Sequence, residues 1–249
     1  MFPDQDEANY DIAMMYLDAN KWKDAFPFLL KAANNNHVKA VSELISTYQM
    51  EVNLRSNSNF IKEFKSWLQD HKEILDVSDV VARKGATYYF LGCISNFPDK
   101  YFHLSKKNDF ILGKYKHALT YYKCCKYAVA LFNYRLCTQD RYFDDLPRQI
   151  RGYIYNDAAL CGWFRDDFIN FAYFNKLARD EELPIAFQNY GNAYFVGRLI
   201  CSKPDYNWAA YWYKLALDKY NEADTVKDDR DFENIKYCAM KLEKCKRLS

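Results

Sequence analysis

The side chains best suited to chemistry in this sequence are its cysteines and histidines, and their spacing decides which chemistry is open to them. The cysteines stand at positions 93, 124, 125, 137, 161, 201, 238 and 245, with no Cys-x-x-Cys pair among them. The histidines stand at 37, 71, 103 and 117, none within four residues of another. Zinc motifs need closely spaced ligand pairs. The spacing therefore predicts no metal site and no cofactor, and reduced cysteines packed as small apolar residues.

Helical periodicity around each histidine predicts its surroundings. His71 falls on the packed face of its helix, which favours a core histidine over a ligand. His37 stands where a helix begins. His117 lies beside Lys114 and Lys116, on a face that we expect to be solvated.

Catalytic groups are sparse. Cys124 and Cys125 diverge by about 100 degrees on a helix, so we expect Cys125 to face the core and Cys124 the solvent, with no base nearby to activate it. The acidic pairs Asp166-Asp167 and Asp228-Asp229 are typical first-turn helix charges. No phosphate loop, nucleophile elbow or paired-histidine zinc motif is present. We therefore predict no catalytic residue and a protein that is not an enzyme.

Composition indicates a folded, mostly helical chain. Of 249 residues, 50% are hydrophobic and 18% aromatic, whereas only 7 are Gly and 6 are Pro. The net charge of +2 gives no global field for nucleic acid or membrane surfaces. The acidic first residues and the lack of a long apolar run predict a cytoplasmic protein without a signal peptide or a transmembrane segment.

Residues 186–216 hold the most regular pattern, two short helices joined by a turn. Small and large residues alternate at helical spacing in the first, at Ala186, Tyr190, Gly191, Tyr194 and Gly197. The second repeats the rule at Ala209, Trp212, Tyr213 and Ala216. Small residues facing large ones predict a close antiparallel helix pair, with a left-handed cap at Gly197.

This pattern, Ala-x4-Gly-x2-Tyr-x2-Gly followed by Asp-x3-Ala-x2-Trp-Tyr-x2-Ala, resembles the Sel-one-like repeat, a relative of the tetratricopeptide repeat. The resemblance is specific over 184–221, fair over 8–48 and partial elsewhere. It implies an all-α fold, a right-handed α-solenoid of antiparallel helix pairs with irregular insertions and a C-terminal capping helix.

The repeats divide the chain as one domain over 1–249. Their approximate ranges are 6–36, 37–76, 80–126, 127–148, 149–180 and 184–221, with a cap over 228–247. Residues 96–111 form an insertion in the third repeat. The range 127–148 fits a degenerate repeat or an inserted helix equally well.

In the related tetratricopeptide fold, the first helices line a concave groove, and carrying those positions over gives a candidate binding site. Its residues are Tyr10, Met14, Ser46, Gln49, Tyr89, Asn96, Gln149, Tyr153, Asn156, Gln188, Asn192 and Phe195. Amides and tyrosines pair with a peptide backbone and offer ring surface. The resemblance thus implies a non-catalytic adaptor or scaffold that binds a peptide or helix of another protein. Such repeats are common in secreted bacterial effectors, which would act in a host cytosol.

Two other functions remain open. Lysines and tyrosines are interleaved over 114–127, a pattern that a platform for single-stranded nucleic acid would have. In the repeat pattern, however, Tyr121 and Tyr122 belong to the core, and the lysines then form an ordinary solvated face. A thiol-dependent enzyme using Cys124 is the second alternative.

Overall fold

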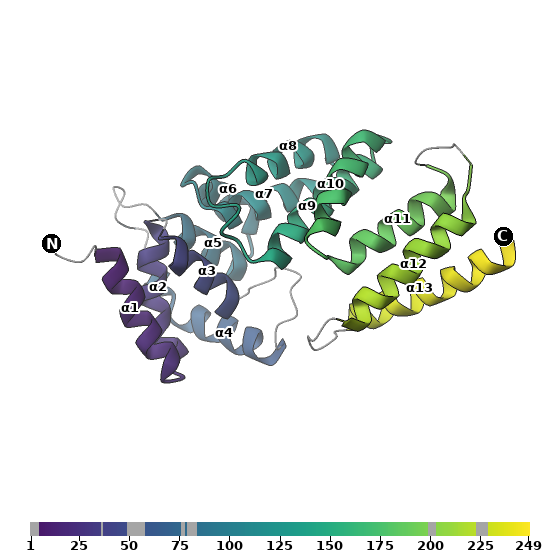
Figure 1. The fold of residues 1–249 in the computed structure, drawn as a ribbon. Coiled ribbons are helices and arrows are strands. Elements are labelled where there is room, and N and C mark those ends of the chain that lie inside the picture. Colours follow the sequence, from purple (N-terminus) through teal and green to yellow (C-terminus); the bar gives the residue numbers. More distant parts are fainter. Residues whose placement is uncertain are drawn as a thin grey trace. The chain divides into compact units, whose positions relative to one another are not determined.

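The chain is helical throughout the part that the computed structural model describes, residues 5–35, 37–48, 58–75, 78, 84–198, 203–222 and 229–249 (Figure 1). Its helices are α1 (Gln5–Asp18), α2 (Trp22–Asn34), α3 (Val38–Thr47), α4 (Ser58–Asp70), the 3-10 helix η1 (Lys72–Leu75), α5 (Gly85–Ile94), α6 (Pro98–Lys107), α7 (Ile111–Lys123), α8 (Tyr127–Thr138), α9 (Arg148–Trp163), α10 (Phe168–Asp180), α11 (Pro184–Val196), α12 (Tyr206–Glu222) and α13 (Asp229–Leu248). None of these helices combines the length and apolarity needed to cross a membrane.

Two compact units make up the chain. The N-terminal unit comprises Met1–Cys124 and Leu136–Pro147, and the C-terminal unit comprises Cys125–Arg135 and Arg148–Ser249. The single domain over 1–249 and the right-handed solenoid stay predictions.

Several of the predicted ranges contain successive helices, while the division into repeats stays a prediction. α1 and α2 fill 6–36, α9 and α10 fill 149–180, α11 and α12 fill 184–221, and α13 is the helix predicted over 228–247. The insertion at 96–111 contains α6, and 127–148 contains α8 followed by turns. The prediction of an all-α fold is therefore confirmed for the described residues.

Aromatic rings form the core of the N-terminal unit. Phe26 of α2 has its ring 5.0 Å from the rings of both Tyr48 and Phe90, and 5.1 Å from that of Phe64. The Tyr48 hydroxyl donates a hydrogen bond of 2.6 Å to the carbonyl oxygen of Trp22. Phe26 meets each of the other three rings edge-on, a favoured geometry for aromatic pairs. These contacts hold α2 against α4 and α5.

Close helix approach in the C-terminal unit explains the small residues of the regular repeat. A Cβ at Gly191 would lie 2.7 Å from the ring of Tyr213, so α11 and α12 touch only because this position is glycine. Gly197 ends α11 at φ 70°, the left-handed cap predicted from the sequence. Ala209, Tyr213 and Ala216 are fully buried, as predicted.

Asp167 begins α10 as its N-cap, and its removal should have a pH-dependent cost. Its Oδ1 accepts from the Asn170 backbone N–H at 3.2 Å and its Oδ2 from the Asn170 side chain at 2.6 Å, contacts that hold the carboxyl pKa below its usual value. Asp167→Ala should lower the free energy of unfolding by about 1 kcal/mol at neutral pH.

The sign of the pH effect follows from the lowered pKa. The cap's charged contribution is complete above the ordinary Asp pKa and is lost as pH falls through the folded-state value. The difference between wild type and Asp167→Ala in urea unfolding should therefore shrink in acid. Asp167→Asn, which keeps an uncharged cap, is the control; an Ala difference that grows in acid would contradict the assignment.

Candidate binding surface

The predicted groove positions of the N-terminal unit do not share one environment. Tyr10 and Met14 are half-buried on α1, with the Tyr10 ring 5.2 Å from that of His37. Tyr89 is only 2% exposed and packs on the rings of Phe90, Phe102 and Phe110, so its expected place in an open groove is wrong.

Two further groove positions, Asn96 and Ser46, lie near helix ends. Asn96 is exposed just after α5. Ser46 lies on α3, but its side chain falls outside the description, and Gln49 lies outside the described residues. The structure thus brings no continuous polar groove together from the described residues of this unit.

In the C-terminal unit, Asn156 belongs to a buried amide network. The Asn189 side chain donates to Asn156 Oδ1 at 2.9 Å and to Asn175 Oδ1 at 3.1 Å, and Asn175 donates to the carbonyl oxygen of Ala186 at 2.9 Å. Asn156 also donates to Asp157 Oδ1 at 3.3 Å, and it is 4% exposed. The expectation that Asn156 points into a groove is wrong, because its amide joins α9 to α11.

The C-terminal helix contacts the predicted groove positions of α11. Asn192 Oδ1 accepts hydrogen bonds of 2.8 Å from the hydroxyls of Tyr213 and Tyr237. The Lys241 ammonium of α13 lies 4.1 Å from the centre of the Phe195 ring. A helix of the same chain therefore occupies this stretch.

The remaining groove positions are also engaged or partly covered. Gln188 is 9% exposed, and its Oε1 accepts from Cys238 Sγ of α13 at 3.4 Å, so its expected open position is wrong. Gln149 and Tyr153 are half-buried on α9, and Tyr153 packs against a cluster that contains Leu183. These positions stabilise the fold of this unit.

Three single-residue expectations need correction, and one is confirmed. His71 is exposed and stacks on the Trp67 ring, because α4 ends one residue earlier. His117 is buried, because α6 covers its face of α7. Cys125 is exposed at φ 56°, because α7 has already ended at Lys123. His37 is the N-cap of α3, as predicted, with its Nδ1 accepting from the backbone N–H of Ala40 at 3.3 Å.

The lysine and tyrosine stretch over 114–127 does not form an open basic platform. Lys114 pairs with Asp109 and Asp140, and Lys116 is 4% exposed, so neither is the solvated lysine that we expected. Lys123 and Lys126 are exposed at the end of α7. A platform needs several accessible cations beside accessible rings, which this segment does not combine.

The thiols divide into buried and exposed groups. Burial raises the pKa of Cys161 and of Cys238 to about 12, so both stay protonated at neutral pH. Cys124 and Cys125 are exposed beyond α7. Among the described residues, no group of three or more His, Cys, Asp or Glu side chains is placed to hold a metal ion.

A surface of stacked rings is the most distinctive exposed feature of the C-terminal unit. We call it the aromatic ladder and define it as Tyr190 and Tyr194 of α11 with Trp208, Tyr211 and Trp212 of α12. Tyr190 stacks on Trp212 with ring centres 4.8 Å apart, and one turn further Tyr194 stacks on Trp208 at 6.0 Å. Tyr211 stands edge-on to Trp208 at 5.4 Å and to Trp212 at 5.3 Å.

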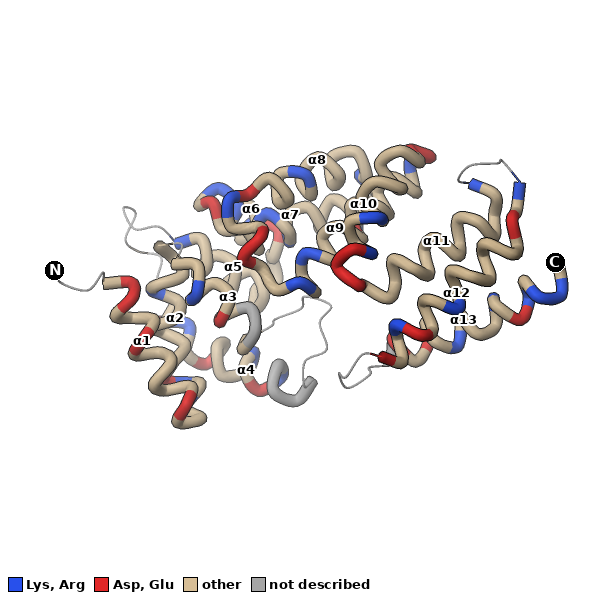
Figure 2. Tube along the Cα trace, in the orientation of Figure 1, with Lys and Arg blue, Asp and Glu red and all other residues tan. Residues whose placement is uncertain are grey.

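The ladder is open to solvent, and the helix segments that carry it have no charged residue of their own. Trp208 and Tyr211 are each 50% exposed. α11 carries no charged residue and is tan in Figure 2, and the first charged residue of α12 is Lys214. Large half-exposed rings on a monomer surface are typical of binding sites.

Arg179 beside the ladder and Arg198 just after α11 both have acidic partners. The Arg179 guanidinium lies 5.9 Å from the centre of the Tyr190 ring and 6.0 Å from that of Trp212, and its Nη2 is 3.0 Å from Asp180 Oδ1. Arg198 lies over the Trp163 ring at 5.1 Å and pairs with Asp166 at 3.4 Å. These pairs offset the positive charge that a phosphate would need.

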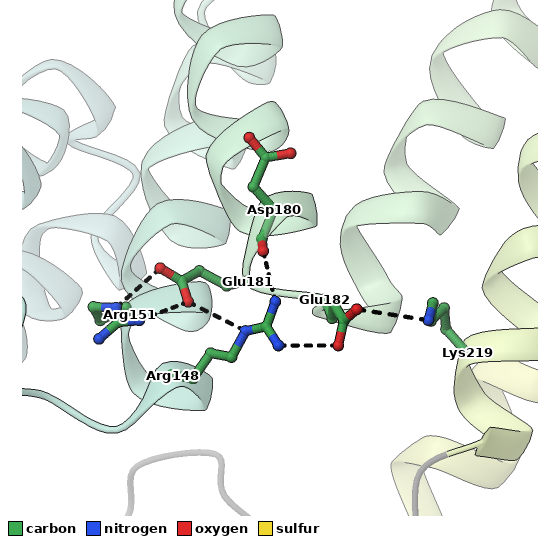
Figure 3. Close-up of polar contacts among 6 residues, drawn as sticks. All are labelled: Arg148, Arg151, Asp180, Glu181, Glu182 and Lys219. Atoms are coloured by element: carbon green, nitrogen blue, oxygen red, sulfur yellow. Dashed lines mark hydrogen bonds and ion pairs between the residues drawn. The ribbon is translucent and has the colours of Figure 1, made fainter.

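A separate ion-pair network connects α9 to the α10–α11 connection and to α12 (Figure 3). Arg151 donates two hydrogen bonds, of 2.9 and 3.0 Å, to the two carboxylate oxygens of Glu181. Arg148 donates to Glu182 Oε2 at 3.0 Å, and Lys219 lies 3.9 Å from the other oxygen of Glu182. Every cation drawn there faces a carboxylate, so the network links α9, the α10–α11 connection and α12.

The fold and this surface define a class, an all-α protein of packed helices that presents exposed stacked rings. Comparison with family models, curated proteins and solved structures gives no significant match. The sequence could have indicated the ladder, because the aromatic residues 190 and 194, and likewise 208 and 212, are spaced by four and so lie on one face of a helix. Sequence reasoning assigned Tyr190, Tyr194 and Trp212 to helix packing and passed over Trp208 and Tyr211.

Proposed function

We propose that this chain is a non-catalytic interaction module that binds an extended, proline-rich segment of another protein along the aromatic ladder. The half-exposed pair Trp208 and Tyr211 carries this proposal. Rings held by their neighbours lose little conformational entropy on binding, and tryptophan and tyrosine dominate interface energetics.

The charge around the ladder favours an uncharged ligand. Arg179 lies over two of its rings and disfavours a cation there, while its contact with Asp180 weakens its attraction for phosphate. Proline-rich segments present flat apolar rings on a preformed backbone, and aromatic-lined grooves are their usual receptors.

Ring spacing also fits such a segment. Successive stacked pairs are one helical turn apart, a rise of about 5.4 Å. Two residues of polyproline II rise about 6.2 Å. Two to three residues of an extended proline-rich chain therefore span the two stacked pairs, Tyr194 with Trp208 and Tyr190 with Trp212.

The groove hypothesis shifts to this surface for a physical reason. In the C-terminal unit the groove residues Gln188, Asn192 and Phe195 contact α13, whereas the ladder has two half-exposed rings. A peptide or partner helix in the groove would have to displace α13.

A decaproline peptide titrated into the full chain tests the proposal through tryptophan fluorescence. The double variant Trp208→Ala, Tyr211→Ala should bind at least about thirtyfold more weakly, the loss of about 2 kcal/mol typical of interface aromatic residues. Its melting temperature should stay close to that of wild type, because both side chains are half exposed.

The matched control replaces two exposed apolar residues of α10, Ile169→Ala and Tyr173→Ala, which should leave affinity unchanged. Equal loss in both double variants, or no peptide binding by wild type, would overturn the proposal. A single-stranded oligonucleotide titrated in parallel separates the nucleic-acid alternative, because phosphate-driven binding falls steeply with salt. Rapid selective alkylation of Cys124 would instead favour the thiol enzyme.

A further inference from the structure

Two histidines that are distant in sequence meet across the α6–α7 hairpin. His103 Nδ1 of α6 lies 3.3 Å from His117 Nε2 of α7, with ring centres 5.2 Å apart. His117 is 8% exposed and has Tyr121 edge-on at 5.0 Å, whereas His103 is exposed. One imidazole is thus held in place and the other is accessible from solvent.

The backbone fixes this pairing. A Cβ at Gly113 would lie 2.2 Å from Ser105 Oγ and 2.8 Å from the backbone nitrogen of Lys106, so α6 and α7 touch at this point. Ser105 Oγ also donates to the carbonyl oxygen of Gly85 at 2.6 Å, which anchors α6 on α5. The two histidines lie within one turn of the contact, so the helices themselves set the distance between the rings.

We propose that His103 and His117 form a binding site for a divalent borderline metal ion such as Zn²⁺ or Ni²⁺. A tetrahedral zinc ion with nitrogen ligands at about 2.0–2.1 Å holds them about 3.3 Å apart. Without a metal ion, the same two nitrogens share a hydrogen bond at this distance. Neutral imidazole is a preferred ligand for zinc, copper and nickel, and water completes the coordination.

The charges around the pair set the strength of the site. Asp99 lies one turn before His103, and its Oδ1 accepts from Thr120 Oγ1 of α7 at 3.1 Å, on the same side of the hairpin. Lys100 and Lys107 stand on α6 within one turn of His103 and are exposed. One nearby carboxylate against two ammonium groups gives a site of moderate affinity.

Calorimetric titration of Zn²⁺ and of Ni²⁺ into the full chain tests the site, with Cys124→Ser and Cys125→Ser present throughout to remove exposed thiol ligands. One ion should bind per chain, and His103→Ala should weaken binding by about tenfold or more. His103 is the residue to replace because it is exposed and its loss leaves the helix packing intact.

His71→Ala removes an exposed histidine elsewhere and should leave the affinity unchanged. Equal affinity in wild type and His103→Ala, or equal loss in His71→Ala, would overturn the assignment. The readout is metal binding alone, so it is independent of the proposed function and of any peptide.

Discussion

Replacing Gly162 by Ala should destabilise the protein by about 3 kcal/mol, the upper part of the range for overpacked sites. A Cβ at Gly162 of α9 would lie 2.6 Å from the backbone nitrogen and 3.1 Å from the Cα of Phe171, and 3.0 Å from the carbonyl oxygen of Asp167. All three atoms belong to backbone, so no side-chain rotation relieves the contact. The α9–α10 pair must separate at its turn, which urea unfolding will show as a lower midpoint.

Gly152→Ala provides the matched control within the same helix. The nearest atoms to a Cβ there are the Cβ atoms of Leu183 at 3.3 Å and Glu181 at 3.4 Å, a contact that a shift of a few tenths of an ångström relieves. Alanine also favours the helix by about 1 kcal/mol over glycine. Gly152→Ala should therefore be neutral or stabilising. Equal losses in the two variants would show that close approach at Gly162 does not limit stability.

The helix pairs of the C-terminal unit were more predictable from the sequence than their closest contacts. Helical spacing of small and large residues placed the α9–α10 and α11–α12 pairs, because a helix must bury one face and its period is fixed. The left-handed cap at Gly197 followed from residue type alone. The difference between Gly152 and Gly162 did not follow, since it depends on which partner atoms lie opposite each one.

The candidate sites were harder to predict, for related reasons. His103 and His117 are fourteen residues apart, and only the packing of α6 on α7 brings them together. Asn156 and Asn192 were predicted to face a groove because of their positions within a repeat. In the structure, Asn156 accepts a hydrogen bond from Asn189, and Asn192 accepts hydrogen bonds from tyrosine hydroxyls of α12 and α13. Polarity in the sequence does not reveal whether the partner of an amide is solvent, a ligand or a neighbouring helix.

Asn189→Asp should be among the most destabilising single substitutions in the C-terminal unit. The Asn189 amide is 7% exposed and donates to two side-chain oxygens, those of Asn156 and Asn175. A carboxylate has no hydrogen to donate and would face both oxygens in the interior. The loss should reach about 3 kcal/mol at neutral pH, the cost of an uncompensated buried charge.

Asn192→Asp is the matched control, because Asn192 Oδ1 only accepts hydrogen bonds from Tyr213 and Tyr237, and a carboxylate accepts them too. Its loss should be much smaller. Burial would raise the pKa of the carboxyl introduced by Asn189→Asp, so the folded state binds the proton more tightly than the unfolded state does. That variant should therefore regain stability as pH falls, whereas a deficit that stays constant with pH would show that lost packing, and not the buried charge, is responsible.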